Sequence, residues 1–555
     1  MKPTLLLAAA LTVMGATACT AGRAPAPAAA TTAAITTEDL RHRLFLIADD
    51  SMMGRESGSL GDYKAADYVA AEFKRLGLEP AGENGTYFQT VPFWSVAVDT
   101  RSRVDAAGTT LQLGRDFVPS SFAATPRTLD DVDAIYGGPL TDSTRWISTS
   151  QAAGKLVVLD LPKGAELRGI AIGGRWRRAA AVALVVLDEV GPEAVARLRE
   201  GRPVADTTRD PNALATLWVS HRTAVTLLGA NPATLTPGAI GAPLHGWFDI
   251  ARNPVAYPAR NVVAILRGSD PALRGQYMSL SAHNDHVGYD HYPVDHDSLR
   301  AYDRVIRPMG ADSPGREPTA AEWKRIRGIL DSLRKVHTPR LDSIRNGADD
   351  DGSGTVALLE IAEAMARGNA HPRRSILFVN HTGEEAGLLG SRWYTDHPTV
   401  PLDSIVGEID EDMVGRGAPD DYPNGVRAAT PTYLEVVGAK RLSKEFGDSL
   451  EAANAREPLP FKFDYTFDAP GHPLQYYCRA DHYSYARYGI PSVALSRGEH
   501  LDYHQVTDEP QYIDYPDLAR VTRMVYSAAM VIADMPHRPT LDVAKPADPH
   551  GRCRQ

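Results

Sequence analysis

The chain has 555 residues, of which 43% are hydrophobic and 23% charged, and its formal net charge at pH 7 is -10. This length exceeds what one hydrophobic core supports, so we expect a globular protein with more than one domain. The negative charge argues against a nucleic-acid-binding protein, which would carry a basic patch or a high pI.

The first residues are typical of an export signal followed by a tether. A lysine precedes the apolar run LLLAAALTVMG and the small residues ATAC, which predicts a signal peptide over residues 1–18. This run is too short to cross a bilayer as a helix, and no later segment has the ~18 apolar residues needed for a transmembrane span. Residues 19–36 are small and Pro-containing, which predicts a flexible tether.

The fate of Cys19 leaves two alternatives open. The cysteine resembles the lipidation site of bacterial lipoproteins, although the usual leucine three residues earlier is replaced by Ala16. Ordinary cleavage after Ala18 fits the small-residue rule equally well. We therefore expect an exported protein that is periplasmic, anchored to the outer membrane through a lipid on Cys19, or secreted.

Two amphipathic helices are predicted next. TTEDLRHRLFLIADDSM begins with a threonine cap, and DYKAADYVAAEFKRLGL ends at Gly77. We assign residues 37–104 to the N-terminal part of the main domain. Between residues 105 and 250, short apolar runs such as GKLVVLDL and AVALVVLDE alternate with turns, which indicates a self-contained β-rich insert.

A second α/β pattern occupies residues 251–537. Short, nearly continuous apolar strands (NVVAILRGS, YMSLSAH, ILFVNH, IVGEID, PSVALS) alternate with helices such as GTVALLEIAEAMARG. This pattern predicts an α/β fold with a mostly parallel, twisted sheet sandwiched by helices. A polar segment over residues 290–345 interrupts the domain, either as a lid over a site or as a surface elaboration. Residues 538–555 are a C-terminal tail.

The three cysteines of the chain, Cys19, Cys478 and Cys553, are too few for a disulfide scaffold or a thiolate metal site. In an oxidising compartment Cys478 and Cys553 can pair if Cys19 is acylated. The sequence leaves the distance between them open.

Metal-competent side chains follow the predicted strands. YMSLSA runs into His283 and Asp285, ILFVNHTG runs into Glu384 and Glu385, and IVGEI leads to Asp412. Because open α/β sheets place ligand sites at the carboxyl ends of their strands, we expect these side chains to share one rim.

The stretch GADDDGSG crowds three aspartates between glycines. Like charges this close repel one another, and an isolated turn of this kind is usually a solvated acidic loop. A pair of cations at the rim would relieve the repulsion, since one carboxylate can bridge two divalent ions. Gly347, Gly352 and Gly354 would let the backbone turn tightly enough to aim one carboxylate into the rim.

Taken in order, SAHNDHVG, GADDDGSGTVALLE, TGEEAGLLGS, DEDMVGR and DYHQVTDE resemble the co-catalytic dizinc exopeptidases. That family includes bacterial leucyl aminopeptidases, glutamate carboxypeptidase II and, as degenerate relatives, glutaminyl cyclases and transferrin receptors. The resemblance covers nearly the whole mature chain. It implies the phosphorylase/hydrolase-like fold of zinc peptidases, with residues 105–250 as a protease-associated (PA-like) domain.

The resemblance implies two zinc ions per chain, held by histidine and carboxylate side chains. His283 and Asp412 would bind one ion, Glu385 and His504 the other, and Asp350 would bridge the two. Nitrogen and oxygen ligands without cysteine suit a catalytic zinc pair, and manganese or cobalt can replace zinc in vitro.

Further roles follow from the same resemblance. Glu384 would be the general base, and Asp285 the carboxylate that orients the ring of His283. Adjacent side chains on an extended segment point in opposite directions, so Glu384 can face the water while Glu385 binds metal. Asp481 and His482, in ADHYSY, would support the ligands or line the substrate pocket. We expect the same of the other nearby histidines, His286, His381 and His500.

The implied function is an exported zinc exopeptidase that acts on peptides through a dizinc-bound hydroxide and a glutamate base. We expect an aminopeptidase first and a carboxypeptidase or dipeptidase second. A glutaminyl cyclase would be shorter, lack the insert and use one zinc, and a non-catalytic receptor would have lost ligands. The substrate's α-amine needs an acidic partner and its carboxylate an arginine, and both residue types are plentiful in the chain.

Overall fold

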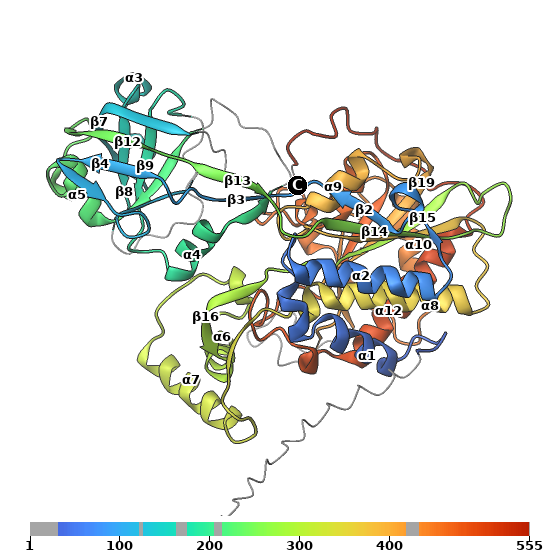
Figure 1. Cartoon of the computed structure of the whole chain (residues 1–555). Helices are drawn as coiled ribbons and strands as arrows, with labels where there is room; N and C mark the ends of the chain where they lie inside the picture. Colours follow the sequence, from blue (N-terminus) through green and yellow to red (C-terminus); the bar gives the residue numbers. More distant parts are fainter. Residues whose placement is uncertain (1–30, 121–125, 163–174, 205–213, 418–431, 554) are drawn as a thin grey trace, which may run out of the picture.

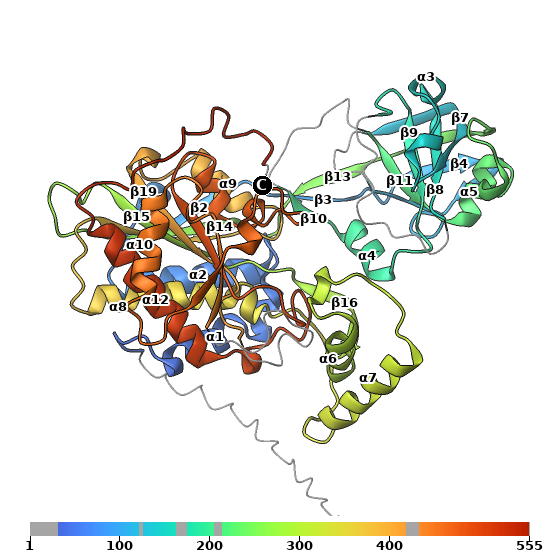
Figure 2. The same ribbon diagram turned by 180° about the vertical axis from the view of Figure 1, so that it is seen from behind.

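The computed structural model describes residues 31–120, 126–162, 175–204, 214–417, 432–553 and 555. Figures 1 and 2 show a large α/β body, a smaller β-rich body and a helical projection formed by α6 (His296–Ile306) and α7 (Ala320–Leu333). The predicted signal peptide, Cys19 and most of the predicted tether lie outside the described residues. In the part of the chain that is described, none of the helices combines the length and the apolar character that crossing a membrane requires.

A nine-stranded sheet forms the centre of the large body, in the order β1-β14-β18-β15-β19-β22-β20-β21 with β2 beside β14. The strands are β1 (Glu79–Pro80), β2 (Phe88–Val91), β14 (Ala259–Leu266), β15 (Tyr277–His283), β18 (Ser375–His381), β19 (Ile405–Glu411), β20 (Tyr433–Val437), β21 (Lys462–Asp464) and β22 (Ser492–Ser496). The four central strands, β18, β15, β19 and β22, are parallel. β14 and β20 run antiparallel to them. The sheet is therefore parallel at its centre and mixed at its margins.

Helices cover both faces of this sheet, unequally. The largest buried apolar cluster lies on the face covered by α1 (Thr37–Ile47), α2 (Leu60–Arg75), α8 (Gly354–Arg367), α10 (Lys444–Asn454) and α12 (Tyr515–Ala533). The opposite face packs against α9 (Leu389–Asp396) and α11 (His482–Ala486). Both helices predicted near the N-terminus are present. Thr36 caps α1, and Gly77 follows α2 with φ 74°.

The smaller body is built on an eight-stranded sheet, in the order β5-β4-β12-β7-β8-β9-β11-β6. Its strands are β4 (Arg103–Ala106), β5 (Thr109–Leu111), β6 (Phe117–Pro119), β7 (Arg127–Pro139), β8 (Leu156–Asp160), β9 (Ala181–Val185), β11 (Thr216–Val219) and β12 (Ile240–Phe248). It has apolar clusters of its own. The antiparallel pair β3 (Trp94–Val98) and β13 (Ile250–Pro254) carries the chain into and out of this body. Its identification as a protease-associated domain stays a prediction.

The segment that interrupts the large body begins and ends in a β-ribbon. β16 (Tyr289–Asp295) pairs antiparallel with β17 (Leu341–Ile344), and α6 and α7 pack on each other between them. The segment joins the end of β15 to the turn before α8, and it projects from the large body below the β-rich body in Figure 1.

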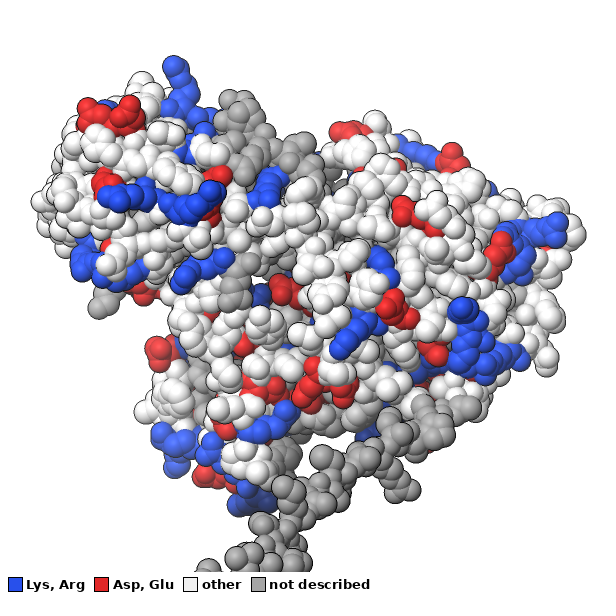
Figure 3. All heavy atoms as spheres, in the orientation of Figure 1, with Lys and Arg blue, Asp and Glu red and all other residues white. Residues whose placement is uncertain are grey.

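The C-terminal tail returns to the large body. Cys478 and Cys553 form a disulfide whose Cα atoms are 5.9 Å apart, so the pairing that the sequence left open is present. Lys545, in the same tail, contacts Asp403 at 2.9 Å. On the face drawn in Figure 3, basic and acidic side chains of the described residues are interspersed and form no broad basic surface there.

Candidate functional site

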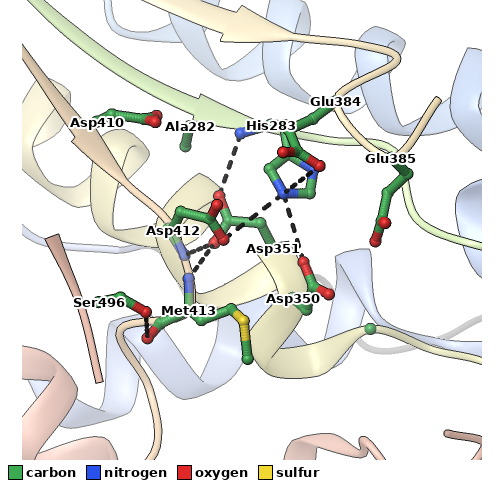
Figure 4. A network of polar contacts seen from close by, with 12 residues as sticks. Ala282, His283, Asp350, Asp351, Glu384, Glu385, Asp410, Asp412, Met413 and Ser496 are labelled. Atoms are coloured by element: carbon green, nitrogen blue, oxygen red, sulfur yellow. Dashed lines mark hydrogen bonds and ion pairs between the residues drawn. The ribbon is translucent and has the colours of Figure 1, made fainter. Parts of the chain in front are cut away.

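The carboxyl ends of β15, β18 and β19 meet at one rim of the central sheet. His283 is the last residue of β15, the turn after β18 carries the two adjacent glutamates, and Asp412 follows β19 directly. Asp350 comes from the turn before α8, and His504 from the loop after β22. Figure 4 shows the His283 ring above Asp350 and Asp412, with Glu384 beside it and Glu385 set apart.

The first candidate cation position lies among His283, Asp350 and Asp412. The Nε2 atom of His283 is 3.4 Å from Oδ1 of Asp350 and 3.7 Å from Oδ1 of Asp412. An Oε2 atom of Glu384 is 4.0 Å from the same nitrogen. Glu384 therefore stands beside this position, where a water bound to a cation would lie within its reach.

The second candidate position lies among Asp350, Glu385, His504 and His286. The Nε2 atom of His504 is 3.0 Å from Oδ2 of Asp350 and 3.0 Å from Oε2 of Glu385. Asp350 thus presents one oxygen to each position, which is the geometry of a bridging carboxylate. All five predicted ligands are brought together.

His286 is closer to the second position than the sequence indicated. Its Nδ1 atom lies 2.8 Å from Oε1 of Glu385 and 3.7 Å from Oδ2 of Asp350, and its ring stands edge-on to His504. The side chain is buried, so it is a further nitrogen available to a cation or to Glu385. The spacing H-x-D-H is the signal that could have pointed to it.

The three adjacent aspartates have three different sets of contacts. Asp350 faces the cation positions. Asp351 accepts hydrogen bonds from the backbone N–H groups of His283, Gly354 and Met413, at 3.1, 2.9 and 3.1 Å. Asp349 accepts one from the N–H of Gly415 and lies 3.2 Å from Nε2 of His500. Two of the three carboxylates therefore hold the backbone that carries the ligands.

Asp285 supports both His283 and Glu384, although not as the sequence predicted. Nδ1 of His283 lies 3.1 Å from the backbone oxygen of Asp285 and 3.6 Å from its carboxylate. The carboxylate instead accepts hydrogen bonds from the hydroxyl of Ser57 at 2.7 Å and the backbone N–H of Glu384 at 3.2 Å. The backbone carbonyl orients the ring, and the carboxylate fixes the segment of the candidate base.

Glu384 and Glu385 occupy a bend and a turn, not the extended segment on which their opposite directions were predicted. Their side chains separate nonetheless, because the turn places Glu384 next to His283 and Glu385 next to His504. The physical reason is the tight turn after β18, in which Gly383 has φ 75° and Gly387 φ 106°.

A buried arginine that the sequence analysis missed ties the ligand-bearing backbone together. Arg55 is fully buried and donates hydrogen bonds to the carbonyls of Asn284 at 2.7 Å and Gly347 at 2.8 Å. The carbonyl of Asn284 directly follows His283, and the carbonyl of Gly347 lies at the start of the GADDDGSG turn. The signal available in the sequence was the stretch GRESG, in which glycines stand on both sides of this arginine.

The pKa values of the site reflect its excess of carboxylates. Burial raises the pKa of Glu384 well above its ordinary value, and Asp412 and Glu385 raise it further. Burial favours neutral His504, but Glu385 and Asp350 raise the pKa of its imidazole to about 10. Burial and Asp350 act to raise the pKa of Glu385, yet His504 and His286 lower it to about 2. Without a bound cation, the carboxylates of the site thus stabilise a positive charge on His504.

The donor set fits divalent cations. Among the described residues, Nε2 of His283, Nε2 of His504 and Oε1 of Glu385 are buried and face only other candidate ligands, at 2.8 to 4.0 Å, without forming a well-aligned hydrogen bond. Buried polar atoms of this kind are rare in folded proteins and call for an explanation such as a bound ion. Imidazole and carboxylate ligands in two groups that share one aspartate suit a zinc pair.

The cation positions open into a pocket whose lining includes Asp350, Glu384, Glu385, Asp412 and His504. Apolar side chains line part of it, including Met413 and Val437. Beyond the candidate ligands, the charged side chains in its lining are Glu435, Glu499 and Arg479. The pocket thus combines an apolar wall with ionic groups close to the rim.

The other side chains that the sequence suggested as supporting or pocket-lining groups are Asp481, His482, His381 and His500. Asp481 and His482 are buried, and neither is among the residues that line the pocket. Burial lowers the pKa of His482 to about 3, so its ring is neutral. His381 contacts the hydroxyl of Tyr485 at 3.1 Å in the core, and His500 contacts Asp349.

Residues 261–529 match the model of peptidase family M28. The chain is 38% identical over 116 residues to Leupeptin-inactivating enzyme 1 of Streptomyces exfoliatus, which covers 20% of this chain and 26% of that protein. It is 30% identical over 198 residues to Leucine aminopeptidase 1 of Penicillium rubens, covering 34% and 48% respectively. The chain thus spans less than half the length of these two curated relatives.

Among solved structures, the aminopeptidase from Aneurinibacillus sp. strain AM-1 is similar over most of its length. The match has a TM-score of 0.51 at 15% identity and covers 92% of this chain and 97% of the other. At this level of identity, the similarity shows a shared fold and nothing beyond it.

Proposed function

We propose that this chain, whose residues 261–529 form a peptidase family M28 domain, is a zinc-dependent exopeptidase that removes N-terminal residues from peptides. The observation that carries the proposal is the pair of cation positions that share Asp350, with Glu384 beside the first of them. The similarity to leucine aminopeptidase 1 of Penicillium rubens supports the same reaction class.

Zinc bound at both positions would polarise the scissile carbonyl and acidify the attacking water. His283 and Asp412 would hold one ion, Glu385 and His504 the other, and Asp350 both. His286, which contacts Glu385 at 2.8 Å, would orient that carboxylate or add a nitrogen to the second ion.

Glu384 acts as the general base in this proposal. Its carboxylate takes the proton of the attacking water and later delivers it to the leaving amine. Asp285 contributes by holding the backbone N–H of Glu384, which keeps the base at the rim.

The charges of the pocket favour a free α-amine over a free carboxylate as the recognised end of the substrate. Beyond the candidate ligands, two carboxylates, Glu435 and Glu499, line the pocket against one guanidinium, Arg479, and this excess of negative charge suits an amine. Arg479 is the guanidinium that a carboxypeptidase would need. Asp312 already contacts it at 3.0 Å and Glu499 stands 3.7 Å away, which neutralises much of its charge.

The alternatives are disfavoured by the same site. A glutaminyl cyclase works with one zinc, whereas two positions are formed here, and a receptor-like relative would lack ligands that this chain retains. Export, with or without a lipid on Cys19, remains part of the proposal and is supported by the N-terminal sequence.

The test is removal and return of the metal. A chelator should abolish hydrolysis of an aminoacyl p-nitroanilide, and Zn²⁺ should restore it with about two equivalents bound per chain. The N-acetylated form of the same substrate should not be cleaved, while peptides with blocked C-termini should be. Activity in a metal-free preparation would contradict the zinc mechanism, and cleavage of N-acetylated peptides would contradict the aminopeptidase assignment.

A further inference from the structure

The segment over residues 289–344 packs against the loop that carries His504. Among the described residues, none from this segment lines the pocket. Instead the backbone N–H of Ala311 donates to the carbonyl of Tyr503 at 3.0 Å, directly before the ligand. The position of the segment therefore does not support a lid over the rim.

Arg300, on α6, makes the most deeply buried contact between the segment and this loop. Its side chain, 4% exposed, forms an ion pair with the fully buried Asp502, two residues before His504. Its guanidinium also stacks 3.6 Å from the ring centre of Tyr512. Asp502 has a second partner, Arg416, at 2.7 Å, so the loop is held from both the segment and the large body.

Two more contacts connect the segment to the same region. Asp312 reaches Arg479 of the pocket at 3.0 Å. Arg340 pairs with both Asp342 and Glu509, at the far end of the loop.

His296, Asp342 and Glu509 could hold a metal ion by their spacing, but Arg340 already places a positive charge between the two carboxylates.

His504 needs such support because of its own conformation. It is a non-glycine residue with φ 55°, in the left-handed region, and its side chain is 23% exposed. Unfavourable backbone conformations persist where the surrounding structure over-determines them. The contacts at Asp502, Tyr503 and Glu509 fix the loop on both sides of this residue.

We propose that residues 289–344 brace the loop Glu499–Glu509 and that Arg300 is a positioning residue for His504 at the second cation position. The inference rests on the proposed zinc function and adds a role for a segment that none of the recognised motifs includes. The ion pair and the Tyr503 contact hold the imidazole where Glu385 and Asp350 can share an ion with it.

Arg300→Met removes the charge while keeping an apolar stem in the buried space, and Asp502 retains Arg416 as a partner. We expect one of the two zinc equivalents to bind about 10–100-fold more weakly, the usual effect of removing a group that orients a ligand. Arg300→Lys, which keeps the charge, should recover part of that affinity. Arg316→Met is the matched control, because Arg316 pairs with Glu322 within the same segment. It should bind both ions as the parent does.

Zinc affinity is measured by competition with a chelator, without substrate, so failure of the peptidase assignment does not affect the result. Hydrogen exchange of the amides between Asp502 and Glu509, in metal-free protein, gives a second readout that should rise in Arg300→Met and not in Arg316→Met. If Arg300→Met does not fold, Tyr512→Leu, which removes only the stacking ring, should show the same changes in milder form. Unchanged zinc affinity and unchanged exchange in a folded variant, or equal losses in Arg316→Met, would overturn the proposal.

Discussion

Glu384 and Glu385 are chemically identical neighbours, yet they have different environments at this site. Glu384 stands beside His283, whereas Glu385 contacts His504 and His286. The structure thus assigns the two carboxylates to different surroundings although they are consecutive in the chain.

Glu384→Gln should keep two zinc ions and the fold while lowering kcat by about 10²–10⁴-fold, the usual worth of a positioned general base. KM should change little, because the lost interaction belongs to the transition state. Glu385→Gln, the matched control, should lose zinc from the second position, since an amide is a poorer ligand than a carboxylate. Metal content and kcat measured on both variants decide the roles, and the reverse pattern would exchange them.

Asp350→Ala should lose more zinc than any other single ligand change. Its two oxygens face the two cation positions, His283 at 3.4 Å and His504 at 3.0 Å, so both ions lose a ligand together. Elemental analysis of this variant and of Asp412→Ala provides the comparison. Retention of one full equivalent by Asp350→Ala would show that the carboxylate does not bridge.

The raised pKa of Asp62 predicts that the free energy of unfolding depends on pH even in the metal-free protein. Burial raises its pKa to about 8, and the charge of Asp285 adds to the effect. The pKa of an unfolded aspartate is about 4, so the folded state binds more protons between pH ~4 and ~8. The stability contributed by protonated Asp62 is full below pH ~4 and is lost as the pH rises through ~8.

Asp62→Asn should remove that decline, because the amide does not titrate and can still meet Gly58 N–H and the Thr382 hydroxyl. We expect the free energy of unfolding of the metal-free variant to exceed that of the parent at pH 8, by an amount that shrinks towards pH 4. Urea unfolding at several pH values measures it. Asp67→Asn, on the same helix, is the control, and parallel curves for Asp62→Asn and the parent would contradict the prediction.

At the scale of the elements, α8 begins where the ligand-bearing backbone is most crowded. A Cβ atom on Gly354 would lie 1.9 Å from the carbonyl oxygen of Glu411, at the end of β19. Glycine at this position therefore permits the close approach of α8 to β19, which brings Asp350 towards Asp412. The sequence predicted that Gly354 allows a tight turn, but its φ of -67° is one that any residue adopts in a helix, and the structure requires glycine there for the close approach instead.

Gly354→Ala should destabilise the fold by about 1–3 kcal/mol, the usual cost of overpacking a tight contact, and should reduce zinc occupancy. Gly328→Ala is the matched control on α7, where an added Cβ meets no atom within 4 Å. That change should stabilise the protein by about 0.5–1 kcal/mol through helix propensity. Thermal unfolding of both variants tests the pair, and equal effects would refute the crowding argument.

At the scale of the whole molecule, the β-rich body is attached through two adjacent strands. Val98 of β3 and Ile250 of β13 are partners in the antiparallel register, so the chain enters and leaves the body at one place. Among the described residues, none of those lining the pocket belongs to this body. We therefore predict that it restricts access and takes no part in the chemistry.

Replacing residues 99–249 by a two-residue Asn-Gly turn should leave two zinc ions bound and hydrolysis of a short aminoacyl substrate close to that of the parent. The discrimination between short and long peptides should change, because the body no longer flanks the rim. Arg197→Ala is the control for one lost contact, the hydrogen bond from Arg197 to the carbonyl of Val287. Loss of zinc on excision, but not in Arg197→Ala, would show that the body supports the site.

The sequence by itself indicated which side chains are candidate ligands and in what order they occur. Residue order after the apolar strands predicted that His283, Glu385 and Asp412 share one rim. The full set, with Asp350 and His504, was implied by the resemblance of the ordered motifs to the dizinc exopeptidases. The sequence also determined the helices with clear caps, such as α1 behind Thr36. The central parallel strands follow from continuous apolar runs, which only strands buried on both faces have.

The tertiary structure decided what depends on distance between remote segments. Examples are the antiparallel pairing of β14 with β18 and of β20 with β22, the disulfide of Cys478 with Cys553, and the position of His286 beside Glu385. Each joins parts of the chain that the sequence alone does not place together. The contact of Arg300 with Asp502 spans 202 positions and is set by packing alone. Local patterns fix which side chains can bind a metal, whereas long-range packing fixes which of them meet.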